Sequence, residues 1–310
     1  MKLKATSTNC FKTMIQNPHL RINFSRTRTI EHQHLFILCS HSSGSTALWR
    51  LLQTSPYVSA LPDEGQHIGT LGPLMRKAPW NEKTELPWKE IKAEWNATWN
   101  LEKPILLEKS PPNLLRAPII ESTFENSAFI IMARNPYAYC EGTRRRRRTG
   151  MGYGRDATYT QITQGWIREG QYQIRNLQQL QRTLYLTYEE LTDNSTATVA
   201  KLLAFMPQLE SLDHQATFYI HSLSGWLEQP LINLNSKQIA RLSAADIAEI
   251  NGVLQEHPEI LAQLGYTLMT GAYPLTTRAR IALSTSFTKY VTRTQQRLAR
   301  RTANHNSRQT

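Results

Sequence analysis

The sequence of 310 residues has few cysteines and no long apolar run. Its three cysteines, Cys10, Cys39 and Cys140, are widely spaced and odd in number, which fits neither a disulfide framework nor a metal-ligand cluster. The longest apolar runs, Leu35 to Cys39 and Ala128 to Ala133, are far shorter than the roughly 20 residues of a membrane-spanning helix. The first residues also lack the apolar stretch of a secretory signal. We therefore expect a cytoplasmic protein in a reducing compartment, and leave peripheral contact with a membrane open.

Acidic residues are absent from both ends of the chain. Residues 1–30 carry six Lys or Arg, residues 275–310 carry eight, and neither segment has an Asp or Glu. The formal net charge is +12, so the body between the two ends carries −2, which does not indicate a generally cationic domain. We expect a basic extension at 1–30, an α/β domain at 31–272 and a basic tail at 273–310. The tail has the charge to contact an anionic surface or polymer.

Strand-like and helix-like segments alternate along the body. The expected strands are HLFILCS, PILLEKS, AFIIMAR and TLYLTYEEL, and the expected helices include GSTALWRLLQTS and PPNLLRAPIIESTF. The strands are continuously apolar, which is typical of strands covered on both faces in a parallel sheet with crossover helices. The sequence therefore predicts a three-layer α/β/α fold with a central parallel sheet. Two short helices should follow in SAADIAEINGVLQEHPEILAQLGY, with Ser243 as N-cap and Gly265 as a helix stop.

The first predicted strand leads into a loop of small residues, Ser40 to Thr46, with the sequence SHSSGST. Backbone amides, a glycine and hydroxyl groups at the start of a helix suit a phosphate group, because the helix dipole favours an anion there. The loop contains no lysine, and the spacing G-x-x-x-x-G-K-[ST] of nucleotide triphosphate loops is absent. Taken alone, this stretch fits a purely structural turn equally well.

Three further segments follow the loop in order, each at the end of a predicted strand: LLEKSPPNLLRAP, AFIIMARNPYAYCEG and LYLTYEELTDN. With the loop, they make the body from Glu31 to Tyr266 resemble the sulfotransferase superfamily, most closely its tyrosylprotein and carbohydrate branches. The resemblance implies a P-loop-like phosphate-binding loop and no metal. It also implies transfer of a sulfuryl group from 3′-phosphoadenosine 5′-phosphosulfate (PAPS) to a hydroxyl of a carbohydrate, a peptidyl tyrosine or a lipid.

Two functions of other classes stay open at this point. One is a catalytically weak nucleotide-binding or scaffold protein of the same fold. The other is a nucleic-acid-binding protein that works through its two basic ends, although the charge of the body argues against it.

The resemblance assigns donor-binding residues. The family's [RK]-S-G-T-T loop, which holds the 5′-phosphosulfate, matches Ser42, Ser43, Gly44, Ser45 and Thr46. Ser42 stands where the family has a basic residue. The strand-end arginine that binds the 3′-phosphate matches Arg134, and the family's serine eight residues later is Gly142 here. A further family arginine, twelve residues after the first, matches Arg146.

A run of five arginines, Arg144 to Arg148, surrounds that last position. Five consecutive residues cover more than one helical turn, so these side chains cannot all face one pocket, and we expect Arg146 to contribute while others are solvated. Weaker nucleotide contacts under the resemblance are Tyr188, in the motif Tyr-Glu-[Asp/Glu]-Leu, and Ser236 with Lys237, in a segment similar to the loop that closes over the donor. A core role for Tyr188 is nearly as well supported.

Catalysis requires a cation for the leaving oxygen and a base for the acceptor hydroxyl. Lys109 corresponds to a strand-end lysine of the tyrosylprotein branch and is the main candidate for the cation that the loop lacks. The alternative is a surface lysine paired with Glu108. His41, inside the loop, would supply part of the missing charge if it were protonated.

The segment SALPDEGQHIG contains the candidate bases. A carboxylate or an imidazole is the usual acceptor of such a proton. Glu64 matches the family's glutamate best, and His67 and Asp63 are the alternatives because the register of the loop is uncertain by a residue.

Overall fold

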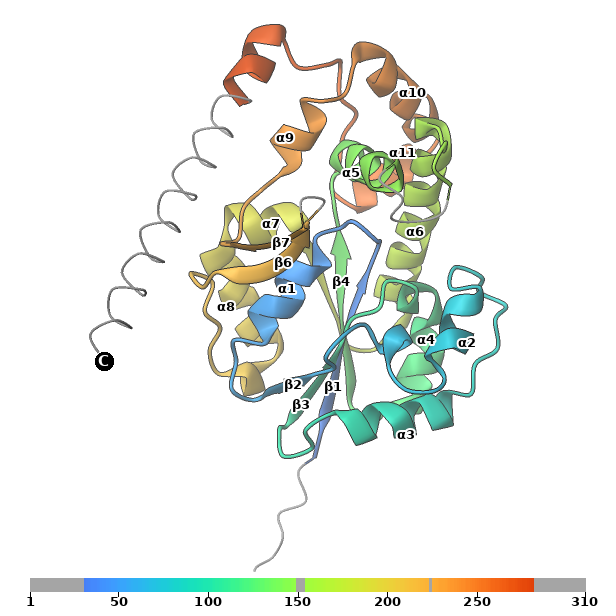
Figure 1. Ribbon diagram of the computed structural model, residues 1–310, viewed down its shortest axis with the longest axis vertical. Helices are drawn as coiled ribbons and strands as arrows, with labels where there is room; N and C mark the ends of the chain where they lie inside the picture. Colours follow the sequence, from blue (N-terminus) through green and yellow to red (C-terminus); the bar gives the residue numbers. More distant parts are fainter. Residues whose placement is uncertain (1–30, 149–153, 223–224, 282–310) are drawn as a thin grey trace, which may run out of the picture. The chain divides into compact units, whose positions relative to one another are not determined.

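The computed structural model describes residues 31–148, 154–222 and 225–281 of the chain (Figure 1). The basic extension expected at 1–30 and residues 282–310 of the expected tail lie outside these ranges.

Five parallel strands form the central sheet in the order β2-β3-β1-β4-β5. The strands are β1 (Gln33–Cys39), β2 (Val58–Ala60), β3 (Ile105–Glu108), β4 (Ser127–Ala133) and β5 (Thr183–Thr187). The most central strand is β1, where Leu35 pairs with Leu107 of β3 and with Ala128 of β4. The parallel sheet predicted from the continuous apolar runs is confirmed.

Helices cover both faces of this sheet (Figure 1). They are α1 (Ser45–Leu52), α2 (Gly72–Lys77), α3 (Trp88–Thr98), α4 (Asn113–Thr123), α5 (Pro136–Arg148), α6 (Tyr159–Gln179), α7 (Tyr188–Asp193), α8 (Ser195–Phe205), α9 (Asn235–Ile239), α10 (Ala244–Leu254) and α11 (Pro258–Gln263), with short 3₁₀ turns η1 (Gly65–His67) and η2 (Pro207–Leu209). Alternate residues of β1 point to opposite faces of the sheet. Leu35 and Ile37 pack with α1 and α8, whereas Phe36 and Leu38 pack with α3 and α4. The three-layer α/β/α arrangement is therefore confirmed.

Local signals explain where several helices begin and end. The hydroxyl of Ser243 accepts a hydrogen bond from the amide of Asp246, and the carboxylate of Asp246 accepts one in return, so Ser243 caps α10 as predicted. Gly265, after α11, has a φ of +76°, which suits a residue that ends a helix.

The expected strand TLYLTYEEL is wrong in its second half. It ends at Thr187, and α7 begins at Tyr188. The reason is a capping box: the Thr187 hydroxyl accepts from the Glu190 amide, and the Glu190 carboxylate accepts from the Thr187 amide. An antiparallel pair, β6 (Phe218–Ser222) and β7 (Gly225–Gln229), was also not expected from the sequence.

The two cysteines within the described ranges, Cys39 and Cys140, are buried and form no disulfide. Burial raises the pKa of the Cys39 thiol to about 11 and that of Cys140 to about 12, so both stay protonated at neutral pH and are poor nucleophiles. Within the same ranges, no helix is long and apolar enough to span a membrane.

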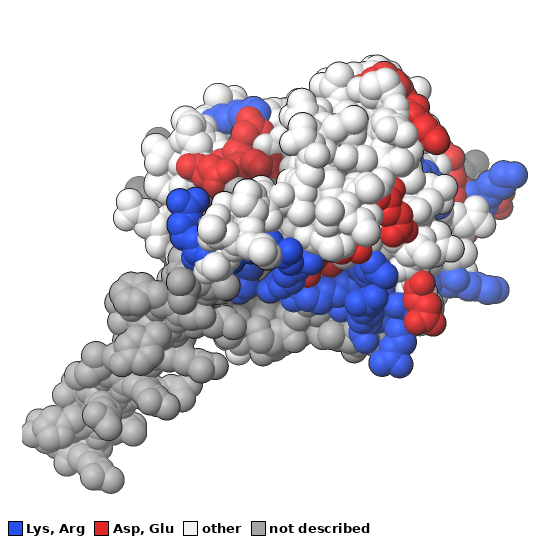
Figure 2. All heavy atoms as spheres, turned by 90° about the horizontal axis from the view of Figure 1, so that it is seen from above, with Lys and Arg blue, Asp and Glu red and all other residues white. Residues whose placement is uncertain are grey.

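Because the five strands are parallel, their carboxyl ends lie at one edge of the sheet. The loop of small residues follows β1, Lys109 follows β3, Arg134 follows β4, and Tyr188 follows β5. Figure 2 looks onto the molecule from above and shows many of the Lys and Arg side chains in one band, with others in separate places on the same face. The fold thus brings the motifs singled out in the sequence to one end of the domain.

Candidate active site

The loop after β1 makes a tight turn before α1 begins at Ser45. Both Ser42, with a φ of +61°, and Gly44, with a φ of +86°, lie in the left-handed region. A Cβ atom at position 44 would lie 2.4 Å from the ring of Tyr188, so only glycine fits there. No side chain caps α1 at Gly44, so no capping group occupies the first backbone amides of the helix.

Arg134 is buried behind this loop and ties three segments together. Its Nη1 donates to the carbonyl oxygen of Ser42 at 2.9 Å, its Nε to Oδ1 of Asn235 at 2.9 Å, and its Nη2 to Oε1 of Gln238 at 2.5 Å. The guanidinium carbon lies 3.9 Å from the centre of the Tyr188 ring. Burial lowers the pKa of Arg134, which nevertheless stays charged at neutral pH.

The Tyr188 ring lies between Gly44 and Arg134. Its hydroxyl donates to the carbonyl of Ile232 at 2.8 Å and accepts from the amide of Leu234 at 3.1 Å. A small cavity of about 80 Å³ beside the ring is also lined by Gly44 and Thr46. The tyrosine therefore connects the loop to the chain that leads into α9.

The α9 helix covers Arg134. Asn235 is oriented by Glu189, whose carboxylate accepts from the Asn235 amide nitrogen, so that Oδ1 of Asn235 faces the arginine. Gln238 fills the space beside Gly142: a Cβ atom there would lie 2.7 Å from Nε2 of Gln238. The sequence predicted that two further residues of α9 contact a nucleotide. Of these, Ser236 is exposed and Lys237 is half-buried.

Lys109 forms an ion pair with Glu64 across the mouth of the site. Its Nζ lies 2.5 Å from Oε1 of Glu64, and the two side chains are 9% and 21% exposed. Oε2 of Glu64 accepts from the amide of Gln66 at 2.5 Å. The pairing of Lys109 with Glu108 considered as an alternative is wrong, because neighbouring residues at a strand end point to opposite sides.

Glu108 is buried on the other side of β3. Its carboxylate accepts hydrogen bonds from the amide of Gly65 at 2.9 Å, from the side chain of Asn113 at 2.8 Å and from the hydroxyl of Ser110. Burial raises the pKa of Glu108. These bonds fix the start of η1 and thereby the segment that presents Glu64.

The other candidate bases, Asp63 and His67, pair with each other, and Oδ1 of Asp63 also accepts from the backbone amide of Glu64 at 2.7 Å. Nδ1 of His67 lies 3.0 Å from Oδ2 of Asp63, and the two side chains are 41% and 62% exposed. Neither residue lines the large cavity of the site, whereas Glu64 does.

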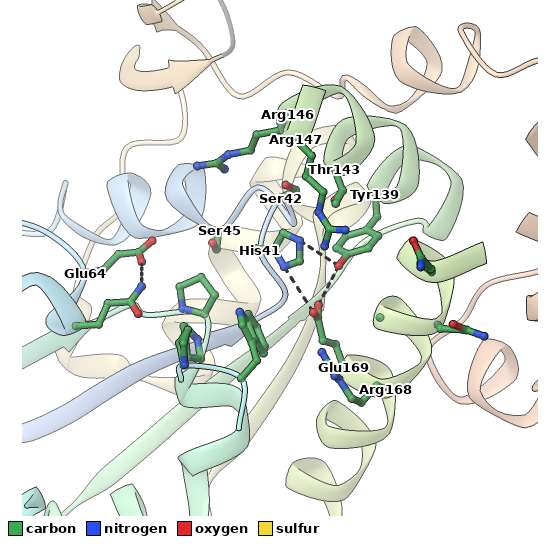
Figure 3. A pocket seen from close by; sticks show the side chains of 18 of the residues that line it. His41, Ser42, Ser45, Glu64, Tyr139, Thr143, Arg146, Arg147, Arg168 and Glu169 are labelled. Atoms are coloured by element: carbon green, nitrogen blue, oxygen red, sulfur yellow. Dashed lines mark hydrogen bonds and ion pairs between the residues drawn. The ribbon is translucent and has the colours of Figure 1, made fainter. Parts of the chain in front are cut away.

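That cavity has a volume of about 760 Å³ and opens beside the loop (Figure 3). Ser42, Ser45, Glu64 and Lys109 line one part of it. The opposite part is formed by α5 and α6, and its lining residues are Tyr139, Thr143, Arg146, Arg147, Gln161, Gln164, Gly165, Arg168 and Glu169.

The arginine run divides as its helical spacing predicts. Arg144 lies 3.5 Å from Asp246 and over the ring of Tyr159, and Arg145 lies 3.0 Å from Glu141. Arg146 and Arg147 line the cavity instead. The sequence favoured Arg146 alone, and Arg147 is an addition.

A further group in the cavity was not predicted as a unit. His41, Tyr139 and Glu169 lie in mutual contact, as the dashed lines of Figure 3 show. Glu169 is in the middle of α6 and only 2% exposed. No motif marks it in the sequence, because a carboxylate on a long amphipathic helix is usually solvated.

Comparison with known proteins identifies the chain. Residues 34–208, more than half of it, match the model of the sulfotransferase family. The chain belongs to the sulfotransferase family. No curated protein matches this sulfotransferase.

Several solved structures are similar to this sulfotransferase. The sulfotransferase domain from the curacin biosynthetic pathway is 22% identical, over 77% of this chain and 99% of that one, with a TM-score of 0.48. A sulfotransferase from Alicyclobacillus acidocaldarius is 14% identical, over 72% and 96%, with a TM-score of 0.43. Mouse sulfotransferase SULT7A1 complexed with PAP is 11% identical, over 76% and 89%, with a TM-score of 0.46.

Most of the predicted site residues of this sulfotransferase thus fall into two neighbouring groups, and His67 belongs to neither. Ser42, Ser45, Glu64, Lys109 and Arg146 line the large cavity. The second group lies around the covered guanidinium of Arg134 and the Tyr188 ring and includes the predicted residues Gly44, Gly142, Arg134 and Tyr188. The predicted residues Ser236 and Lys237 are on α9, whose Asn235 and Gln238 contact Arg134. Ser43 is fully buried in the loop between the two groups, and Thr46 lines the small cavity.

Proposed function

We propose that this sulfotransferase transfers a sulfuryl group from PAPS to a hydroxyl group of a carbohydrate, a peptidyl tyrosine or a lipid. The observation that carries the proposal is the pair of Lys109 and Glu64, 2.5 Å apart, in the cavity that Ser42 and Ser45 also line. Such a transfer needs a base for the acceptor proton and a cation for the leaving oxygen. This pair provides both groups beside the loop.

The loop and the cavity suit the donor. The turn through Ser42 and Gly44 places backbone amides at the start of α1, where an anion is favoured. The cavity of about 760 Å³ is within the range of roughly 300–1,000 Å³ that is typical of small-molecule sites. We assign the loop to the 5′-phosphosulfate, Arg134 with Arg146 to the 3′-phosphate, and Tyr188 to the nucleoside. PAPS supplies the sulfuryl group.

The ion pair couples the two catalytic tasks. Glu64 accepts hydrogen bonds from Lys109 and Gln66, so its carboxylate is held in one orientation. When Glu64 takes the proton of the acceptor hydroxyl, its negative charge is lost. Lys109 then has no counter-ion, and its full charge stabilises the leaving oxygen as negative charge develops there.

Calorimetry with adenosine 3′,5′-bisphosphate tests the donor site. The protein should bind this nucleotide more tightly than AMP, which lacks the 3′-phosphate. Arg134→Ala should reduce the affinity by at least about tenfold, as expected for loss of a charge-assisted hydrogen bond. A protein that binds neither nucleotide would contradict the proposal. Transfer of labelled sulfate from PAPS to a cell extract then tests the reaction.

A second candidate is a nucleotide-binding scaffold with weak or no catalysis. The observation that favours it is the state of Arg134, whose guanidinium donates to three acceptors of the chain itself and lies under α9. Position 42 also has a serine where the family has a basic residue, and position 142 has a glycine where the family has a serine. Tight nucleotide binding without transfer to any acceptor in the extract would support this candidate.

A further inference from the structure

Two helix faces form the part of the large cavity that lies opposite the loop (Figure 3). The residues that line this part include Thr143, Arg146 and Arg147 of α5, and Gln161, Gln164, Gly165 and Arg168 of α6. Within each helix successive members are mostly three or four positions apart, so they share one side of it. This part of the cavity is therefore built from polar and basic side chains on two rigid elements.

The lining of the cavity carries more positive than negative charge. Leaving His41 aside, it contains four basic side chains and two carboxylates, a formal excess of two positive charges. Lys109 is paired with Glu64, so these two charges largely cancel. Glu169 is only 2% exposed and accepts a hydrogen bond from Tyr139. The excess positive charge that faces the cavity therefore lies with the arginines of α5 and α6.

Two of these arginines have no role in the proposed donor site. Arg146 is assigned to the 3′-phosphate, which leaves Arg147, half-buried, and Arg168, exposed. None of the ion pairs that the described residues form includes Arg147 or Arg168. The preceding Arg144 and Arg145, by contrast, each pair with a carboxylate outside the cavity lining. The charge of two guanidinium groups is thus available to a ligand in the cavity.

We infer that the acceptor is an acidic molecule, whose carboxylate, sulfate or phosphate group pairs with Arg147 and Arg168 while its hydroxyl lies at Glu64. The inference rests on the proposed sulfuryl transfer and names the chemical class of its acceptor. Figure 3 shows Glu64 on one side of His41 and both arginines on the other, so the two ends of such a molecule bind at opposite parts of one cavity. Guanidinium groups form strong, charge-assisted hydrogen bonds with such anions. An uncharged alcohol would use neither arginine.

Two further features of this wall suit a polar ligand. The hydroxyl oxygen of Thr143 is buried and has no hydrogen-bond partner among the described residues. Buried hydroxyl groups are normally hydrogen-bonded, and a polar group of the ligand would supply the missing partner. Gly165, three residues before Arg168, leaves space in the cavity, since beyond its own helix and chain neighbours nothing lies within 4 Å of a Cβ atom built there. The wall thus has room for a ligand beside Arg168.

The acid group takes no part in the bond changes. The bond between sulfur and the bridging oxygen of the donor phosphate breaks, a bond between sulfur and the acceptor oxygen forms, and the acceptor proton goes to Glu64. Arg147 and Arg168 hold the acceptor so that its hydroxyl reaches Glu64. Their loss should therefore raise KM for the acceptor much more than it lowers kcat.

The identity of the acceptor is the first test. The labelled product of the extract assay, isolated and identified by mass spectrometry, should come from an acceptor with an acid group close to the modified hydroxyl. Esterifying that acid group should raise KM by about tenfold or more. An acceptor without such a group, or one that the ester replaces without loss, would overturn the inference. A wild-type protein that transfers to no acceptor would instead overturn the proposed function.

Two variants test the residues. Arg147→Gln and Arg168→Gln should each raise KM for the acid acceptor by about tenfold, as expected for loss of a charge-assisted hydrogen bond. The affinity for adenosine 3′,5′-bisphosphate, measured by calorimetry, should stay nearly unchanged. In the double variant the ester and the acid should have similar KM values, because the contacts that distinguish them are already lost. Equal discrimination in the wild type and the double variant would overturn the inference.

Arg144→Gln is the matched control. Arg144 belongs to the same arginine run but pairs with Asp246 and lies outside the lining of the cavity, so its replacement should leave KM unchanged. If Arg147→Gln and Arg168→Gln lower the nucleotide affinity and leave the acceptor KM unchanged, the two arginines bind the donor and the inference is wrong.

Gly165→Leu tests the position of the acceptor without removing a charge. The leucine fills the open space beside Arg168, so KM for the acceptor should rise by about tenfold or more while nucleotide affinity is kept. Gly252→Leu is the control, because Gly252 also lies inside a helix with open space around it but outside the cavity lining. An unchanged KM in Gly165→Leu would show that the acceptor binds elsewhere and overturn the inference.

Discussion

Gly142 and Gln238 fit each other: a Cβ atom on the glycine would lie 2.7 Å from Nε2 of the glutamine, whose Oε1 accepts a hydrogen bond from Arg134. A serine at this position would therefore require the end of the Gln238 side chain to move. The absence of a side chain at position 142 and the presence of Gln238 are one structural feature, because Gln238 occupies the space and holds the guanidinium.

Gly142→Ser should destabilise the protein by about 1 kcal/mol, because the end of the Gln238 side chain must move aside and give up its hydrogen bond to Arg134. The same substitution should cost less in a Gln238→Ala background, where the space is open. Denaturant unfolding of the four proteins measures this coupling. Gly252→Ser is the control, because Gly252 is also inside a helix but has open space around it. Equal costs of Gly142→Ser in both backgrounds would contradict the prediction.

Arg134→Lys should lower the free energy of unfolding by about 2–3 kcal/mol, although the charge is kept. A lysine cannot reach Ser42, Asn235 and Gln238 in the fork geometry of the guanidinium, so buried acceptors lose their partners. Thermal and chemical unfolding measure the loss. Arg175→Lys is the control, since Arg175 pairs with the half-exposed Glu82 and should cost less than about 1 kcal/mol. Similar losses for both would contradict the special role of Arg134.

Lys109→Ala should lower the turnover rate by roughly 100-fold, the scale of losing one preorganised electrostatic partner, with little change in nucleotide affinity. Glu64→Gln should abolish transfer and likewise leave nucleotide affinity nearly intact. Because the two residues act as one pair, the double variant should be hardly slower than the slower single variant. Steady-state kinetics and calorimetry measure the two effects. If His67→Ala alone abolishes transfer, the assignment of the base to Glu64 is wrong.

Glu108→Gln should make the protein more stable than the wild type at neutral pH. Burial raises the pKa of Glu108 above its ordinary 4.5, so folding favours the protonated form. Its contribution to stability is therefore complete below the unfolded pKa and decreases as the pH rises through the folded pKa. The amide keeps the shape of the side chain. Nδ2 of Asn113 donates to Glu108 in the wild type, and a turn of the Asn113 amide by 180° brings its unpartnered Oδ1 into position to accept from the glutamine.

Thermal unfolding of both proteins between about pH 4 and 8 checks this prediction. The melting temperature of Glu108→Gln should increase relative to that of the wild type as the pH rises. A difference in melting temperature that does not change with pH would show that Glu108 is ionised at no cost. Glu94→Gln, at a half-buried carboxylate whose pKa is lowered by its bonds to Thr70, should show the opposite sign.

The parts of the fold that depend on local signals were predictable from the sequence. The buried strands follow from continuous apolar runs, and the cap at Ser243 follows from a hydroxyl three residues before an acid. The start of α7 was also accessible, because Thr187 and Glu190 have the spacing of a capping box. The strand-like composition of TLYLTY concealed it. The position of α9 over Arg134 was not accessible, since it depends on packing between distant segments.

The sequence by itself determined which motifs lie together at the candidate active site, because residues that follow parallel strands meet at one end of the sheet. Only the tertiary structure decided which residues pair there. Lys109 turns from its neighbour Glu108 to Glu64, Gln238 fills the space beside Gly142, and Glu169 reaches His41 from a helix that begins far along the chain. The physical reason is that opposite charges and close packing act between surfaces in contact, and contact between distant segments is set by how helices and loops pack on the sheet.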